Sequence, residues 1–208
     1  CYRYIKMRLF PSLRYKHLPQ GHPKKGKGQV HRSNVAHPGH RSIERRAYTI
    51  YTRKAPFHWE IDSVVGKAEG KSESCLVMTE RTTRAEIVLK VKDKTATETV
   101  KALQRPKPET GRDWYMILKT LTRDKRCHPQ APHERGTNEV TNKLVRRKLP
   151  KGKSMAKVTQ KQATEVQHWV NHYTRPMFGG KSAADKLRAE LDKLSLYDRA
   201  KVYKFFDL

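Results

Sequence analysis

The chain has 208 residues, of which 36% are hydrophobic, so its length and composition allow one domain with an extension or two small domains. It carries 46 Lys and Arg against 20 Asp and Glu, a formal net charge of +26, which predicts a polyanionic partner such as nucleic acid. No apolar run is long enough to span a membrane, and three scattered cysteines exclude a disulfide framework, so we expect a reducing, intracellular setting.

The first 57 residues concentrate the positive charge. They contain 14 Lys and Arg and a single acid, Glu44, so half of the net charge lies on about a quarter of the length. Residues 1–57 therefore read as a basic arm or linker, poorly ordered by itself. Lys24, Lys25 and Lys27 belong to this arm and are expected to contact DNA phosphates without sequence preference. The alternative interpretation is a solvated linker, and both can hold together.

From residue 58 onwards the sequence shows strand patterns. Runs of β-branched and apolar residues separated by short polar breaks predict three antiparallel strands, at residues 58–66, 74–82 and 85–93. The break between the first two is a hairpin loop, and the break before Ala85 is a tight turn. A fourth strand is expected over residues 114–124.

Helical patterns follow the third strand. Thr95 and Glu98 have the spacing of a capping box, and Ala96, Val100 and Leu103 mark the apolar face of the expected helix. Further helices are predicted at 137–149, at 159–173, and as one long helix from about Ser182 into the C-terminus. Three strands, a helix, a strand and then helices predict an α/β fold, a mixed sheet flanked by helices, in the order of ribonuclease-H-like nucleases.

Three acids stand where a metal site would need them. Asp62 lies inside the apolar first strand, Asp124 ends the fourth strand, and Glu139 falls in the first turn of the following helix. If the two strands are neighbours and the helix crosses their ends, the carboxylates converge, and hard divalent ions such as Mg²⁺ would relieve their repulsion. Such a site suits phosphoryl-ester chemistry. The alternative is that each acid is solvated or salt-bridged.

The helix that carries Glu139 has a polar face. Glu139, Asn142, Lys143 and Arg146 fall at positions i, i+3, i+4 and i+7. This face offers a carboxylate, an amide and two cations, so Asn142, Lys143 and Arg146 are candidate contacts to a DNA backbone. The alternative is an ordinary solvated helix face.

Four motifs occur in order along the chain: "FHWEIDSVVGK", "TERTTRAEIVLKVKDKTATETVKAL", "HPQAPHERGTNEVTNKLVRRKLPKG" and "WVNHYTRPMFGGKSA". In these motifs the chain resembles the transposases of the insertion-sequence family called IS-thirty, over roughly residues 40 to 190. The resemblance implies a ribonuclease-H-like core of the retroviral-integrase type with an Asp-Asp-Glu triad, which falls on Asp62, Asp124 and Glu139. It also implies two bound Mg²⁺ or Mn²⁺ ions and Mg²⁺-dependent DNA strand cleavage and strand transfer at insertion-sequence ends.

The same resemblance implies a setting and partners. The partner is double-stranded DNA, comprising the insertion-sequence ends and the target DNA, and a homo-oligomer is expected to form on it. The location is the bacterial cytoplasm, in association with the nucleoid, with no membrane involvement. Residues 58–208 would form the integrase-like catalytic core with its C-terminal helices.

The chain departs from the family pattern in one region. Lys125 and Arg126 stand where the family has Asn-Gly, and the chain passes from Asp124 to His128 in four residues, where the family has a longer spacer. We therefore expect an internal deletion, a truncated N-terminus that lacks the family's helix-turn-helix region, and a chain that does not catalyse transposition. The rival hypothesis is a non-catalytic basic nucleic-acid-binding protein, which the charge alone would suggest.

Overall fold

A computed structural model of the chain describes residues 48–66, 73–123 and 136–208, together with residues 5, 7, 9 and 12. The chain divides into two compact units, Cys1–Val35 and Ala36–Leu208, and all elements named below belong to the second. The predicted boundary between an arm and a core at residues 57 and 58 stays a prediction. Within the described ranges, no helix has the length and apolar character needed to cross a membrane.

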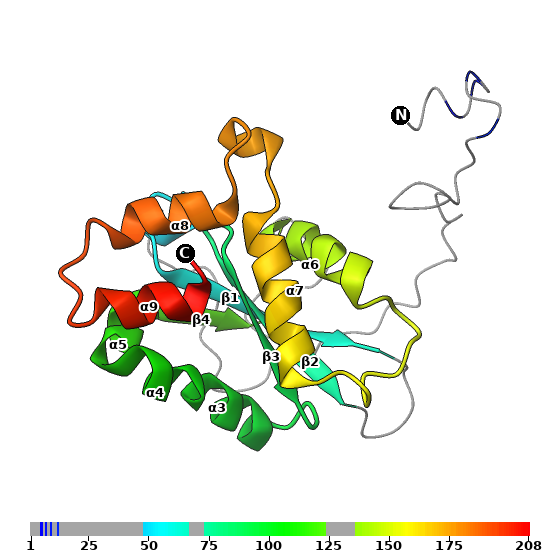
Figure 1. Cartoon of the computed structure of the whole chain (residues 1–208), viewed down its shortest axis with the longest axis horizontal. Helices are drawn as coiled ribbons and strands as arrows, with labels where there is room; N and C mark the ends of the chain where they lie inside the picture. Colours follow the sequence, from blue (N-terminus) through cyan, green and yellow to red (C-terminus); the bar gives the residue numbers. More distant parts are fainter. Residues whose placement is uncertain are drawn as a thin grey trace. The chain divides into compact units, whose positions relative to one another are not determined.

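A mixed four-stranded sheet forms the centre of this unit, with its strands in the order β3-β2-β1-β4 (Figure 1). The strands are β1 (His58–Val65), β2 (Ser74–Glu80), β3 (Glu86–Val91) and β4 (Thr120–Arg123). β2 is antiparallel to both β1 and β3, whereas β4 is parallel to β1. The predicted α/β class, with a mixed sheet flanked by helices, is therefore confirmed.

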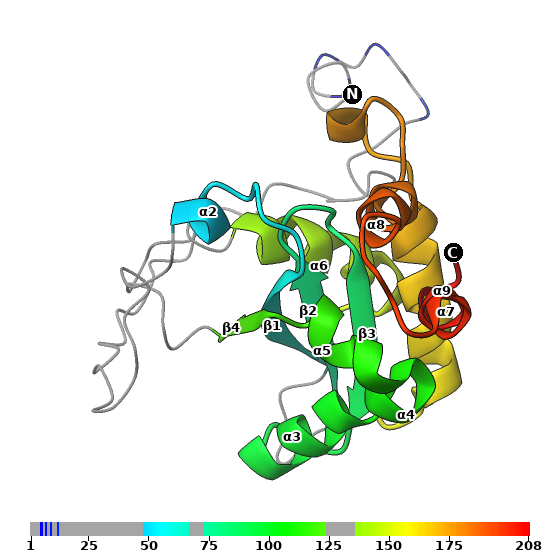
Figure 2. The ribbon, with the colours of Figure 1, turned by 90° about the vertical axis from the view of Figure 1, so that its left-hand side faces the viewer.

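Helices cover both faces of the sheet, as the view in Figure 2 shows. They are α2 (Tyr48–Tyr51), α3 (Ala96–Gln104), α4 (Pro106–Thr110), α5 (Trp114–Ile117), α6 (Gly136–Lys148), α7 (Gln160–His172), α8 (Ala183–Leu191) and α9 (Arg199–Phe206), with 3-10 turns at Gly111–Asp113 and Pro176–Phe178. The predicted helices at 137–149 and 159–173 correspond to α6 and α7.

The alternation of side chains along β1 separates two apolar cores. Trp59 and Ile61 point into the first core, which α3, α5, α8 and α9 cover. Trp59 is fully buried, its Nε1 donates to the carbonyl of Ile117 at 2.6 Å, and its ring stacks on Phe206 with centroids 6.3 Å apart. Trp59 is therefore a packing residue of the first core. Val64 points to the opposite face, into the second core under α6 and α7.

Helix α7 satisfies the free edge of the sheet. The backbone N–H groups of Glu86, Val88 and Lys90 on β3 donate to the side-chain oxygens of Asn171 (2.7 Å), Gln167 (3.0 Å) and Gln160 (2.9 Å), respectively. Edge strands otherwise present unpaired N–H and C=O groups to other chains. These three amides on one helix therefore take the place of a fifth strand.

Two predicted elements are wrong in part. The apolar run at 114–124 begins as helix α5, and only Thr120–Arg123 form a strand. Trp114 and Ile117 are both buried, at helical spacing, and a short apolar run does not distinguish this period from a strand. The expected long C-terminal helix is two helices, α8 and α9. It breaks because buried Asp113 accepts the N–H groups of Tyr197 (2.9 Å) and Asp198 (2.8 Å).

Only one of the two hydrogen bonds of the predicted capping box is present at the start of α3. Thr95 accepts from the N–H of Glu98 at 3.2 Å, but its own N–H donates to Asp93 rather than to Glu98. Of the predicted apolar face, Leu103 packs against the first core, but Val100 is 53% exposed whereas Ala102 is buried. The helix thus packs through a face rotated from the expected one.

Candidate functional site

The middle of β1 carries two acids on the same face, and they have different surroundings. Glu60 is fully buried and forms an ion pair with Arg81, which is 3% exposed. A buried charge of this kind is stable only when it is paired, so the Glu60–Arg81 contact is structural. Asp62, two residues further on, is half-buried.

The "TERTTR" motif builds the turn beside this pair. Buried Glu80 accepts hydrogen bonds from the N–H groups of Phe57 (2.8 Å), Thr82 (2.8 Å) and Thr83 (2.6 Å), and Arg84 adopts φ 63°. Burial raises the pKa of Glu80, while these donors act in the opposite direction. The motif therefore fixes the turn between β2 and β3 and the start of β1.

Among the residues that the structure describes, two donors hold the Asp62 carboxylate. Its Oδ1 accepts from the N–H of Ser63 at 2.8 Å, and its Oδ2 accepts from Nδ2 of Asn142 at 2.7 Å. The second bond crosses from β1 to α6, between residues 80 apart in sequence. Each carboxylate oxygen has more than one lone pair, so these bonds orient Asp62 without exhausting its capacity as an acceptor or ligand.

Helix α6 directs Asn142 and Arg146 inwards. Asn142 contacts Asp62, and Nη1 of Arg146 donates to the carbonyl of Val65 at 2.6 Å. Burial lowers the pKa of Arg146, and the negative charge of Asp62 opposes this shift. Lys143, in contrast, is exposed. The face predicted as one DNA-contacting surface is thus divided between the sheet and the solvent.

The buried side of α6 faces the second core. Leu144, Val145 and Leu149 are buried there, whereas Val140 is 60% exposed. This orientation of α6 is what brings Asn142 over β1.

The other two candidate acids fall at the margins of the described structure. β4 pairs in parallel with β1, and its last residue, Arg123, lies opposite Ile61. Asp124 is the next residue in sequence and lies outside the described residues. Glu139 is the fourth residue of α6, three before Asn142, and its side chain also lies outside them. The convergence of the three carboxylates therefore stays a prediction, as do the contacts of Lys24, Lys25 and Lys27.

A divalent cation fits the part of the site that is described. The carboxylate of Asp62 is anchored and half-buried, and Oδ1 of neighbouring Asn142 is a buried oxygen with no hydrogen-bond partner among the described groups. Carboxylate and amide oxygens are the ligands that hard cations prefer. The sequence pattern predicted that Asn142 contacts a DNA backbone, and the signal for its actual contact is its position one turn after Glu139.

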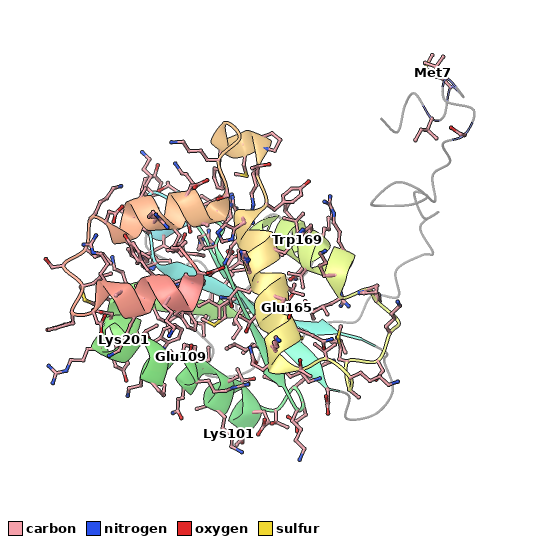
Figure 3. The ribbon with its side chains drawn as sticks, viewed as in Figure 1. Met7, Lys101, Glu109, Glu165, Trp169 and Lys201 are labelled. Carbon is pink, nitrogen blue, oxygen red and sulfur yellow. The ribbon has the colours of Figure 1, made fainter. Side chains whose placement is uncertain are left out.

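Basic side chains continue along the last turn of α6. Exposed Arg147 lies over the ring of Tyr173, at 5.3 Å from the centroid, and exposed Lys148 lies over Trp169, at 4.7 Å. Trp169, labelled on α7 in Figure 3, is partly buried and packs against the second core.

Comparison with known proteins gives several similar transposases. The chain is 30% identical over 176 residues to the transposase for insertion sequence element IS1086 of Cupriavidus metallidurans, covering 77% of this chain and 49% of that protein. It is 30% identical to the probable transposase for insertion-like sequence element IS1161 of Streptococcus salivarius, over 69% of this chain and 45% of that protein. It is also 30% identical to the transposase InsI for IS30C of Escherichia coli, over 64% of this chain and 38% of that protein.

The chain thus spans about half the length, or less, of these curated relatives. No family model matches it. The matched proteins come from different bacteria and are all described as transposases or probable transposases of insertion elements, and IS30 transposases are among them, as the sequence motifs predicted. The chain belongs to the family of insertion-sequence transposases that includes those of IS30.

Proposed function

We propose that this chain is the core of a DNA transposase with a ribonuclease-H-like fold of the retroviral-integrase type. The reaction of such a core is cleavage of DNA at the ends of the insertion sequence and transfer of the freed 3′-OH to target DNA. The transposase relatives and the mixed sheet, with β4 parallel to β1, support this assignment.

The hydrogen bond between Asn142 and Asp62 is the observation that carries the proposal. It ties α6, the helix that contains Glu139, to the middle of β1. Because β4 runs parallel beside β1 and ends at Arg123, Asp124 is covalently attached at the neighbouring strand end. The helix that contains Glu139 and the strand that precedes Asp124 are thus both neighbours of β1, which carries Asp62.

Asp62, Asp124 and Glu139 would hold two Mg²⁺ or Mn²⁺ ions. When bound, such ions supply Lewis-acid activation of the attacking oxygen and stabilisation of the leaving oxygen. The chain's own groups orient the metal-binding carboxylate and bind DNA phosphates. Asn142 and the N–H of Ser63 fix the Asp62 carboxylate, and the exposed Lys143 would contact DNA phosphates, with Arg146 closer to the sheet.

The short connection before α6 bears on activity. Twelve residues, 124–135, join the end of β4 to the start of α6, and they include Pro129 and Pro132. They are too few to supply a supporting helix and a return strand, whereas a functional site needs its ligands held to within about 0.5 Å. We therefore propose that this chain binds double-stranded DNA and binds divalent cations weakly, but does not cleave DNA.

The partners and location follow from the same proposal. The basic residues of the N-terminal segment would add affinity for DNA phosphates, and copies of the chain would assemble as a homo-oligomer on DNA in the bacterial nucleoid. The rival function, a basic nucleic-acid-binding protein without a metal site, predicts the same DNA binding but no role for Asp62.

The experiment uses the purified full chain, Mn²⁺, and a DNA fragment that contains the sequences flanking the gene, with a scrambled fragment as control. We expect DNA binding without specific nicking, and Mn²⁺ binding that is lost in Asp62→Asn. Specific nicking that disappears in Glu139→Gln would show that the short connection suffices. Mn²⁺ binding that is unchanged in Asp62→Asn would instead favour the rival function.

A further inference from the structure

A second group of metal-binding side chains lies where α7 and α9 meet, away from Asp62. His168 and His172 are one turn apart in the C-terminal half of α7, and Asp207 follows the last residue of α9. One ligand atom from each of the three side chains lies within 4.8 Å of the others. In both views the end of the chain comes to rest beside α7 (Figures 1 and 2).

The contacts within this group orient the two imidazoles. Nε2 of His168 lies 3.0 Å from Oδ2 of Asp207. Nδ1 of His172 lies 3.0 Å from the backbone carbonyl of His168, and the two rings are 4.2 Å apart between centroids. A carbonyl can only accept, so this contact assigns the proton of neutral His172 to Nδ1 and leaves the lone pair on Nε2. Metal-binding histidines characteristically use their second nitrogen in this way.

The backbone also holds Asp207 in a defined position. Asp207 caps α9 in the left-handed conformation, with φ 57° and ψ 56°, and its N–H donates to carbonyls of the last turn. Its neighbour Phe206 is fully buried and stacks on Trp59 of β1, so the end of α9 is anchored in the first core. The Asp207 carboxylate therefore approaches α7 from a chain end that is anchored in the first core.

We propose that His168, His172 and Asp207 form a binding site for a transition-metal ion of the Zn²⁺ class. Two imidazoles and one carboxylate are a ligand set that Zn²⁺ takes, with a fourth position for water, and the exposure of all three side chains leaves that position open. Mg²⁺ prefers oxygen ligands throughout, so this site differs in chemistry from the one around Asp62.

The bound ion would connect α7 to the C-terminal end of α9. Without metal, this junction depends on the packing of Phe206, on the His168–Asp207 contact, and on a long hydrogen bond from Gln167 to the carbonyl of Phe205 at 3.4 Å. An ion that binds only the folded chain stabilises it in proportion to its occupancy. The site is thus structural, and it does not depend on the proposed transposase activity.

The test measures Zn²⁺ binding by calorimetry and thermal unfolding of the full chain. Because the chain has 10 histidines, the informative quantity is the difference between variants. His172→Gln removes one ligand, and Asp207→Asn removes the carboxylate while keeping a side chain that tolerates the left-handed conformation. Glu109→Gln is the charge-matched control, on α4 and apart from the C-terminal half of α7 (Figure 3).

We expect Zn²⁺ to raise the Tm of the wild type and of Glu109→Gln, and each ligand variant to lose both this rise and one equivalent of bound Zn²⁺. Mg²⁺ at the same concentration should have no such effect. If His172→Gln and Asp207→Asn bind as many equivalents as the wild type and keep the rise in Tm, the proposal is wrong and the group is an ordinary ion pair. Unchanged Tm values without metal would show that the variants fold, which separates loss of binding from loss of structure.

Discussion

Asn142 donates to Asp62 across a distance of 2.7 Å, and this bond joins the helix and the strand that carry two of the three candidate acids. The amide oxygen of Asn142 is buried without a hydrogen-bond partner among the described groups, so the described part of the chain leaves this acceptor unsatisfied. A group of this kind is costly to bury, and its retention beside a carboxylate indicates a function.

Asn142→Ala should therefore weaken Mn²⁺ binding without unfolding the protein. Residues that hydrogen-bond to metal ligands typically contribute a factor of about 10 to 100 in affinity, and we expect a loss of about tenfold here. Mn²⁺ binding followed by electron paramagnetic resonance measures it. Lys143→Ala is the matched control, because Lys143 is the next residue of the same helix and is exposed. Equal effects of the two variants would argue against the positioning role of Asn142.

The two acids of β1 should respond oppositely to neutralisation. Glu60→Gln removes the negative charge of the buried Glu60–Arg81 ion pair, and breaking such a pair costs about 3–5 kcal/mol in the free energy of unfolding. Asp62→Asn, in the absence of metal, should be neutral or slightly stabilising, because it relieves repulsion among the candidate carboxylates. Urea unfolding of both variants gives the comparison. A large destabilisation by Asp62→Asn would indicate that Asp62 is a structural acid like Glu60.

The contrast between Glu60 and Asp62 shows which features of the site could be predicted from the sequence and which could not. Strand β1 and its acids were predictable, because an apolar run with acids in its middle is unusual. The sequence did not show that Arg81 pairs with Glu60, since that pairing depends on how β1 and β2 align in the sheet.

The predicted elements that were wrong failed for tertiary reasons. The break between α8 and α9 depends on the carboxylate of Asp113, which is 84 residues away from Tyr197 in the chain. Helix α6 presents Val140 to solvent because the second core accepts Leu144 and Val145 instead. Periodicity gives the existence of a helix, but the rotation of its faces depends on the surface that it packs against.

The stability of the protein should decrease as the pH rises from about 5 to 8. Glu86 is fully buried, and burial raises its pKa from 4.5 to about 8, although the Thr79 hydroxyl and Arg175 favour its charged form. The folded state therefore retains a proton that the unfolded state releases above about pH 4.5. This contribution is complete at low pH and is lost as the pH approaches 8.

The measurement is the free energy of unfolding in urea at pH 5, 6.5 and 8. A tenfold difference in proton affinity between the folded and unfolded states corresponds to about 1.4 kcal/mol, so the wild type should lose on the order of a few kcal/mol across this range. Glu86→Gln should flatten the dependence, and because all other titrating groups are shared, the difference between the two proteins isolates Glu86. Parallel curves for the two proteins would contradict the assignment.

Deleting the N-terminal basic residues should flatten the salt dependence of DNA binding. The deletion should end at residue 47, because Phe57 is part of the first core and the carbonyls of Arg53 and Ala55 accept from Thr82. Residues 1–47 contain 12 Lys and Arg and one acid. Each phosphate contact contributes about 0.9 to the slope of log K against log salt, so the slope should fall by several units. An unchanged slope would show that these residues do not contact DNA.

Gly66→Ala should destabilise the protein and weaken the site around Asp62 together. Gly66 follows β1, and a Cβ atom there would lie 2.1 Å from the carbonyl oxygen of Lys153 and 2.9 Å from Cγ of Met155. Met155 is buried in the second core, so the opposing backbone cannot move away freely. Overpacking of this kind costs about 1–3 kcal/mol, and a shift of Gly66 away from this contact would move the adjacent carbonyl of Val65, which Arg146 holds.

Gly179→Ala is the control for this last variant. Gly179 has φ 64° and open space around an added Cβ, so alanine there meets backbone strain but no clash, at a cost of about 1–2 kcal/mol. Urea unfolding and Mn²⁺ binding should be measured on both proteins. Because Gly179 ends the 3-10 turn between α7 and α8, whereas Gly66 follows β1, only Gly66→Ala should lower Mn²⁺ affinity. If Gly66→Ala loses stability but binds Mn²⁺ as tightly as the wild type, a displacement at the end of β1 does not affect the position of the Asp62 carboxylate.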